Sequence, residues 1–141
     1  MAPEGTTPLP TTTDQLLRSM PYAAALGMVI TDAAPDAVHG HLDWDPGLCT
    51  TAGIVHGGAL MTFADTLGAL CAFLNLPPGA STATIESKTN MFRAVRAGRV
   101  GGVSAPLHVG RTTIVVQTDL RDDAGKRVAQ VTQTQAVLPP T

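Results

Sequence analysis

The residues with the clearest chemical potential in this sequence lie between Gly53 and Asp65. The segment 53–58 reads GIVHGG and leads into an apolar run that contains Asp65. Paired glycines allow a ligand to approach the backbone, and the N–H groups of a helix's first turn are unpaired, with the positive end of the helix dipole behind them. Such a terminus can hold a carbonyl oxygen and stabilise the oxyanion that forms on attack. A glycine turn packed against a strand, with His56 only as its cap, is the alternative interpretation.

Asp65 favours a catalytic role for this segment, because a carboxylate inside an otherwise apolar helix costs free energy unless it is hydrogen-bonded or takes part in a reaction. Between Gly57 and Leu76 it is the only formally charged side chain. Burial would raise its pKa and hydrogen bonds to the carboxylate would lower it, and the sequence leaves open which effect is larger. A carboxylate that only bonds a neighbouring hydroxyl or the backbone is the structural alternative. Together with the glycines, Asp65 favours a functional interpretation.

The spacing of these groups predicts an assembly. Asp65 follows Gly57 by eight residues, which at a rise of ~1.5 Å per residue places it about 12 Å further along a helix. A nucleophile and an oxyanion donor must act on one carbonyl, with reacting atoms only ~3–3.5 Å apart. One helix cannot supply both, so we expect antiparallel helices of two subunits, with Gly57 of one chain facing Asp65 of the other. The sequence therefore predicts a homodimer with two shared sites.

The element that positions these groups is a helix of about eighteen residues that starts at Gly57 and closes before Pro77. The run is long enough to cross a bilayer. Asp65 near its middle, its glycines and the lack of flanking Lys or Arg argue against that location. We expect instead a helix buried on all sides inside a sheet-wrapped core, and no membrane partner.

The remaining elements are predicted from apolar patterns and turn residues. Thr13 is predicted to cap a short helix with an apolar stripe, and the proline- and threonine-rich residues 1–12 are predicted to be a disordered tail. Residues 28–44 are predicted to form a first strand or a hairpin, with a turn at 34–36. From Thr82 onward there is no helical period, and β-favouring residues recur in four blocks. These blocks are 82–92, 99–109, 112–120 and 127–138, with predicted hairpin turns at 96–98, 110 and 122–125. The pattern predicts a single α+β domain, residues 13–141, in which an antiparallel sheet wraps one long helix.

Composition bounds the class of protein. The 141 residues are 44% hydrophobic and only 14% charged, against ~25% charged in ordinary globular proteins, so part of the surface is expected to lie under partner chains. A net charge of -2 argues against a nucleic-acid partner. Cys49 and Cys71 form neither a CxxC motif nor a disulfide framework, and the N-terminus has no signal-like pattern. We therefore expect a cytoplasmic protein.

In these residues the chain resembles the hotdog-fold acyl-CoA thioesterases, in particular the PaaI-like branch named for phenylacetate degradation. The resemblance spans about residues 20–138. The segments that carry it are GIVHGG at 53–58 followed by Ala64 and Asp65, TIESKTN at 84–90, and HVGRT at 108–112. It implies a central helix wrapped by a curved antiparallel sheet, dimers whose sheets join edge to edge, and commonly a homotetramer of two dimers.

The resemblance also implies roles for individual residues. Asp65 would attack the thioester carbonyl or activate a water, the Gly57 N–H would be the oxyanion donor, and His56 would orient the loop. Thr50 stands where the family often has an Asn or Gln that positions the attacking water. Thr84 matches a strand position whose Ser or Thr often reaches the active carboxylate. The expected substrate-binding residues are Gly58, Thr66, Arg93 and Arg111.

Arg93 and Arg111 belong to the segment 87–118, which holds five basic and no acidic side chains. This distribution suits the phosphates of coenzyme A. Solvated turn and edge charges are the alternative. Part of the acyl pocket is expected at 20–28, which includes Tyr22. His39 and His41 are read as surface residues, and neither a metal nor another cofactor is expected. The expected reaction is hydrolysis of an acyl-CoA to free acid and CoA; a non-catalytic acyl-CoA binder and a hotdog hydratase or dehydratase are the alternatives.

Overall fold

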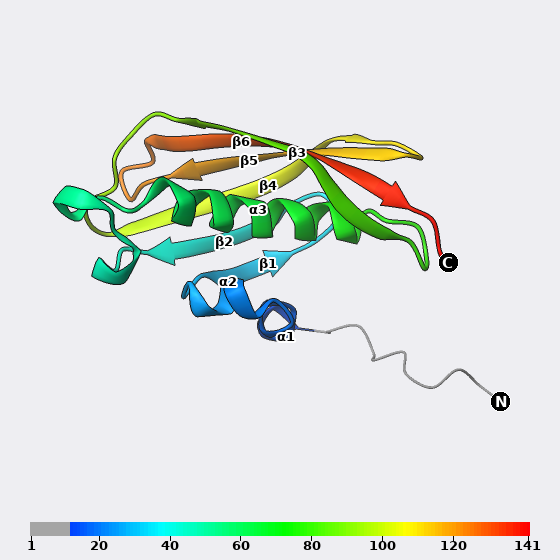
Figure 1. The fold of residues 1–141 in the computed structure, drawn as a ribbon, viewed down its shortest axis with the longest axis horizontal. Helices are drawn as coiled ribbons and strands as arrows, with labels where there is room; N and C mark the ends of the chain where they lie inside the picture. The colour runs from blue at the N-terminus through cyan, green and yellow to red at the C-terminus, as the bar shows by residue number, and fades with distance from the viewer. Residues whose placement is uncertain (1–11) are drawn as a thin grey trace.

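The computed structural model describes residues 12–141, in which one long helix lies across a single six-stranded sheet (Figure 1). The three α-helices and six strands follow one another in an order close to the predicted one. They are α1 (Thr13–Arg18), α2 (Pro21–Ala25), β1 (Val29–Ala33), β2 (Val38–Asp43), α3 (Gly57–Leu74), β3 (Ser81–Met91), β4 (Arg99–Val109), β5 (Thr113–Arg121) and β6 (Arg127–Leu138). Two short 3-10 turns, Pro46–Leu48 and Thr51–Gly53, precede α3.

The sheet is antiparallel throughout, and its strand order is β1-β2-β4-β5-β6-β3. The predicted α+β architecture, a sheet around a long helix, is confirmed. The prediction of a hairpin turn at 96–98 is wrong, because β3 pairs with β6 at the far edge of the sheet and not with β4. β4 already pairs with β2 on one side and β5 on the other, so neither of its edges is free for β3. The segment 92–98 is therefore a crossover from β3 at one edge of the sheet to β4, an interior strand between β2 and β5.

Helix α3 packs one face against the sheet, and ten of its eighteen residues are buried, among them Phe63 and Leu67. Two glycines of the sheet make this close approach possible. A Cβ on Gly102 would lie 2.7 Å from Leu67 Cδ1, and one on Gly40 would lie 3.0 Å from Leu67 Cδ2. Bare backbone at these positions lets the helix sit directly on the strands.

The opposite face of α3 carries exposed residues, including Met61, which is 42% exposed, and Asp65 one turn later. The prediction of a helix buried on all sides is therefore wrong for the single chain. Within residues 12–141, α3 is the one helix with the length and composition to cross a bilayer, and 56% of it is buried inside the protein. The sheet thus buries one face of α3 and leaves a stripe of residues around Asp65 exposed.

The N-terminal helix is capped one residue earlier than predicted. Thr12, and not Thr13, accepts the Gln15 N–H through its side chain, and the Gln15 side chain accepts the Thr12 N–H in return. This reciprocal pair is a capping box, which satisfies two N–H groups at once. The rest of the expected tail, residues 1–11, lies outside the described part of the chain.

Candidate active site

The start of α3 is held in place by backbone hydrogen bonds from the two residues that precede it. Val55 N–H donates to the Val95 carbonyl at 2.9 Å, and His56 N–H donates to the Leu48 carbonyl at 2.8 Å. His56 then caps the helix, because its Nδ1 accepts the Gly58 N–H at 2.8 Å. A neutral imidazole that accepts at Nδ1 carries its proton at Nε2. His56 therefore orients the first turn of α3 and keeps an N–H donor at its outer nitrogen.

Gly57 supplies the free donor of this turn. Its N–H has no acceptor among residues 12–141, whereas the next N–H is taken by His56. A Cβ on Gly57 would lie 2.9 Å from Met91 Cε and 3.0 Å from Met91 Sδ, so the end of β3 covers the position where any other side chain would project. The turn thus presents one unpaired N–H at the positive end of a long helix, which is the arrangement that stabilises an oxyanion.

Asp65 lies on the exposed stripe of α3 and still has a hydrogen-bond partner from the sheet. The Gln133 side chain on β6 donates from Nε2 to Asp65 Oδ1 at 2.6 Å. Partial burial raises the pKa of Asp65 above its ordinary value, and the Gln133 hydrogen bond offsets part of that rise. The group is therefore a stronger base than an ordinary aspartate and can serve as a nucleophile or a general base.

A second glutamine lies beside the first. Gln135 donates from Nε2 to Thr84 Oγ1 at 2.9 Å, and Thr82 Oγ1 donates to the Ala136 carbonyl at 2.9 Å. Thr84 therefore bonds Gln135, and no hydrogen bond joins it to Asp65 within residues 12–141. The sequence analysis missed both glutamines. The signal was present, since two amides two residues apart in a strand project to the same face, and that face of β6 is otherwise apolar.

Three other predicted site residues, Thr50, Gly58 and Thr66, differ in their exposure and in their hydrogen-bond partners. Thr50 is exposed, and its backbone N–H donates to the Ile54 carbonyl at 2.8 Å, so it belongs to the loop that positions His56. Gly58 is half-buried and bonded to His56. Thr66 is 7% exposed, and its hydroxyl donates to the Thr62 carbonyl at 2.8 Å, which places it inside the single chain and away from its surface.

Arg93 and Arg111 do not meet within one chain. Arg93 N–H donates to the Val128 carbonyl at the start of β6, and Val137 N–H donates to the Thr112 carbonyl at its end. Nine residues of strand at ~3.3 Å each place the two arginines about 30 Å apart. The basic run that looks like a cluster in the sequence is therefore spread over the length of the sheet.

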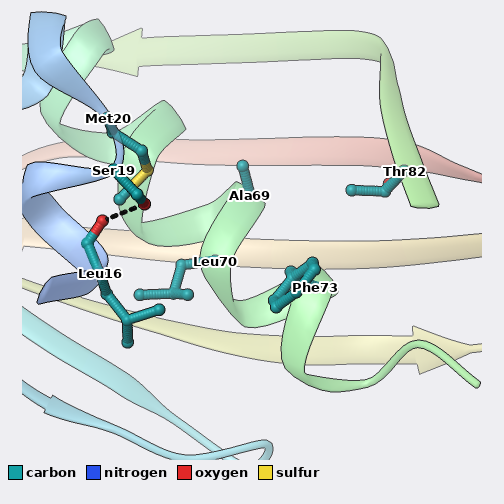
Figure 2. Close-up of a pocket in the computed structure, with 7 residues that line it drawn as sticks. All are labelled: Leu16, Ser19, Met20, Ala69, Leu70, Phe73 and Thr82. Atoms are coloured by element: carbon teal, nitrogen blue, oxygen red, sulfur yellow. Dashed lines mark hydrogen bonds between the residues drawn. The ribbon is translucent and has the colours of Figure 1, made fainter. Parts of the chain in front are cut away.

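An apolar cavity of about 320 Å³ opens beside the second half of α3 (Figure 2). Ala69, one turn after Asp65, lies on its wall, and Thr82 closes the side formed by β3. The predicted contribution of the N-terminal segment is limited to its first residues, since Met20 lines the cavity and Tyr22 is 71% exposed and not part of it. The complete lining consists of Leu16, Ser19, Met20, Ala69, Leu70, Phe73 and Thr82.

The remaining candidate nucleophiles are poorly suited to the reaction. Burial, with a further contribution from Asp36, raises the pKa of Cys71 to about 11, so this residue is a thiol and not a thiolate at neutral pH. Within residues 12–141, no three His, Cys, Asp or Glu side chains come together as a metal site. Asp65 is thus the base or nucleophile that this region offers.

Comparison with known proteins agrees with this geometry. Residues 52–129, more than half of the chain, match the family model described as the thioesterase superfamily. The proofreading thioesterase EntH of Cronobacter sakazakii is 31% identical over 113 residues, which cover 80% of this chain and 82% of that protein. A thioesterase of Haemophilus influenzae superposes with a TM-score of 0.86 at 26% identity, covering 92% of both chains. A mutant thioesterase of Pseudomonas aeruginosa gives a TM-score of 0.85 at 28% identity, covering 91% of this chain and 94% of that one. The chain therefore belongs to the thioesterase superfamily and is a thioester hydrolase of the hotdog fold.

Proposed function

We propose that this protein hydrolyses acyl-CoA thioesters to a free acid and CoA, at sites shared by two copies of the chain. One observation carries the proposal. The free N–H of Gly57 and the Gln133-bound carboxylate of Asp65 lie on the same helix, about 12 Å apart along its axis at ~1.5 Å per residue. Antiparallel helices of two copies bring the donor of one chain to the carboxylate of the other.

The chemistry divides between these two groups. The thioester oxygen accepts from the Gly57 N–H, which stabilises the negative charge that develops when the carbonyl is attacked. Asp65 of the second copy either attacks the carbonyl carbon itself or takes a proton from the water that does. The C–S bond then breaks, and CoA leaves as a thiolate that gains a proton. Where Asp65 is the nucleophile, a water then hydrolyses the acyl anhydride formed on its carboxylate, which releases the free acid and restores Asp65. His56 fixes the donor turn, and we assign to the Thr50 hydroxyl the role of holding the water.

The exposed stripe of α3 and the outer edge of β3 supply the surface for the second copy. β3 is the last strand of the sheet, and Ile85 on it is 63% exposed. An exposed edge strand presents unpaired backbone N–H and C=O groups that can pair with another chain. Pairing of two β3 edges would also cover Met61 and the surroundings of Asp65. A homodimer is thus the smallest active unit, and two dimers would form the homotetramer.

The antiparallel arrangement gives the two arginines a common ligand. Arg93 lies at the end of the sheet near the start of α3, and Arg111 lies at the opposite end. In a dimer with antiparallel α3 helices, Arg93 of one copy and Arg111 of the other would lie at the same end of the dimer. That end would receive the phosphates of CoA, while the acyl group would enter the cavity beside Ala69.

The test is a thiol-release assay with acetyl-, hexanoyl-, dodecanoyl- and phenylacetyl-CoA. Wild type should release CoA from at least one of them, and Asp65→Asn should lower kcat by ~10²–10⁴-fold. Asp32→Asn is the matched control, since this exposed aspartate on β1 lies outside the site. Saturable acyl-CoA binding without thiol release would replace hydrolysis with a binding function. Turnover in Asp65→Asn at the wild-type rate would overturn the mechanism.

A further inference from the structure

We propose that Gln133 is a positioning residue for Asp65, holding one oxygen of its carboxylate from beneath α3 in a space that only a glycine at position 68 leaves open. This inference rests on the proposed function for its catalytic meaning, and its physical part stands on contacts within one chain. Neither Gln133 nor Gly68 belongs to the motifs from which the site was predicted.

The first contact is the hydrogen bond itself. Gln133 is fully buried in the middle of β6, with Val116 of β5 on one side and Ser87 of β3 on the other. Its Nε2 donates to Asp65 Oδ1 at 2.6 Å. The reversed amide would set an acceptor oxygen against the carboxylate, so the donor must face Asp65. The orientation of the amide is thus fixed by the charge that it supports.

The second contact shows that this orientation is built into the helix. A Cβ on Gly68 would overlap Gln133 Oε1 and lie 2.9 Å from its Cδ, so any side chain at position 68 would displace the Gln133 amide. Gln133 Oε1 is buried and has no hydrogen-bond partner within residues 12–141. An orphaned buried acceptor costs free energy. This unpaired oxygen belongs to the same amide whose Nε2 donates to Asp65.

The arrangement has two effects on the carboxylate. Oδ1 is held by Gln133, so Oδ2 remains for chemistry, with no hydrogen bond from residues 12–141. A donor to the ionised form also stabilises that form against partial burial. No charged side chain of residues 12–141 shares this task. On β3, Glu86 and Lys88 are exposed, and on β5 the charged residues lie on the outer face. The pKa of Asp65 responds to burial and to Gln133 and to no ionisable side chain of residues 12–141.

The experiment compares Gln133→Met with wild type by ¹³C NMR titration of the Asp65 carboxyl group. Methionine keeps the length and volume of glutamine and removes the donor. We expect the Asp65 pKa to rise in the variant, the acid limb of kcat/KM to move to higher pH by the same amount, and kcat at pH 7 to fall by ~10–100-fold. A merely structural role would not move the titration of Asp65.

Gln135→Met is the matched control, because Gln135 is equally buried on the same strand and bonds Thr84 instead of Asp65. It should lower stability to a similar degree and leave the Asp65 pKa at the wild-type value. If Gln133→Met does not fold, Gly68→Ala displaces the amide without changing Gln133 and should also raise the Asp65 pKa. An Asp65 pKa that is the same in wild type, Gln133→Met and Gly68→Ala would overturn the inference. Absence of thiol release from wild type would instead defeat the proposed function, and the titration would still decide the role of Gln133.

Discussion

His56 Nδ1 accepts the N–H of Gly58 at 2.8 Å, and this bond leaves the N–H of Gly57 as the unpaired donor of the first turn of α3. The side chain that caps the helix therefore also selects which backbone group is free to bind an oxyanion. The selection depends on sequence spacing of two residues and on the extended backbone of His56, with φ -59° and ψ 134°.

The role of the Gly57 N–H is tested by two substitutions at the same position. Gly57→Pro removes the N–H, and proline is tolerated at the first position of a helix after an extended residue. Gly57→Ala keeps the N–H and introduces the same contact with the flexible end of Met91. Thiol-release kinetics should show kcat lower by ~10²–10³-fold in the proline variant than in the alanine variant. Equal rates in the two would mean that another group binds the oxygen.

Shared sites predict complementation between two inactive chains. Co-refolding equal amounts of Gly57→Pro and Asp65→Asn gives mixed dimers in which one of the two sites combines an intact Gly57 with an intact Asp65. If pairing is random, half of the dimers are mixed, and about a quarter of wild-type activity should return. Each variant refolded alone is the control. No recovery from the mixture, with mixed dimers demonstrated by mass spectrometry, would place both groups in one chain.

The effect of Gly68→Ala on the free energy of unfolding is predicted to depend on residue 133, and to change sign when Gln133 is removed. In wild type the new Cβ meets Gln133 Oε1, and such overpacking should cost ~1–3 kcal/mol of stability. In a Gln133→Ala background the obstacle is gone, and the better helix propensity of alanine should make the same change neutral or stabilising by up to ~1 kcal/mol. Urea unfolding of the four proteins forms a double-mutant cycle. Equal effects of Gly68→Ala in both backgrounds would contradict the contact.

Asp65→Asn should lower activity and raise the Tm relative to wild type at pH 7. The folded-state pKa of Asp65 is raised, so the fold favours its protonated form. That contribution is complete below the unfolded-state pKa and is lost as pH rises through the folded-state value. Asparagine does not titrate, so the Tm of the variant relative to wild type should be higher at pH 7 than at pH 4. A relative Tm that falls over this range would mean that the ionised carboxylate stabilises the fold.

The cavity beside Ala69 predicts the length of the preferred acyl group. Its volume of about 320 Å³ lies at the small end of the ~300–1,000 Å³ typical of ligand sites. Ala69→Leu would fill part of it, and each excluded CH₂ group forfeits ~0.8 kcal/mol of burial. We expect kcat/KM for hexanoyl-CoA to drop by ~10-fold or more, with acetyl-CoA turnover retained as the internal control. A loss that is equal for both substrates would place the acyl group elsewhere.

The local elements of this protein follow from nearby residues. The helix from Gly57, the hairpin at 29–43 and the strand blocks are predictable because apolar period and turn residues act within a few positions. The HGG turn followed by Asp65 likewise indicated an oxyanion donor and a carboxylate on one helix, and the resemblance of these residues to hotdog thioesterases is confirmed at the level of the superfamily.

Only the tertiary structure decided which elements meet. The place of β3 beside β6, the exposed stripe around Asp65 and the distance between Arg93 and Arg111 depend on pairings between residues far apart in the chain. Gln133 reaches Asp65 across 68 positions and through a gap left by a missing side chain at Gly68. No local pattern encodes such a contact, because it arises when a strand and a helix are brought together by the core that both of them bury.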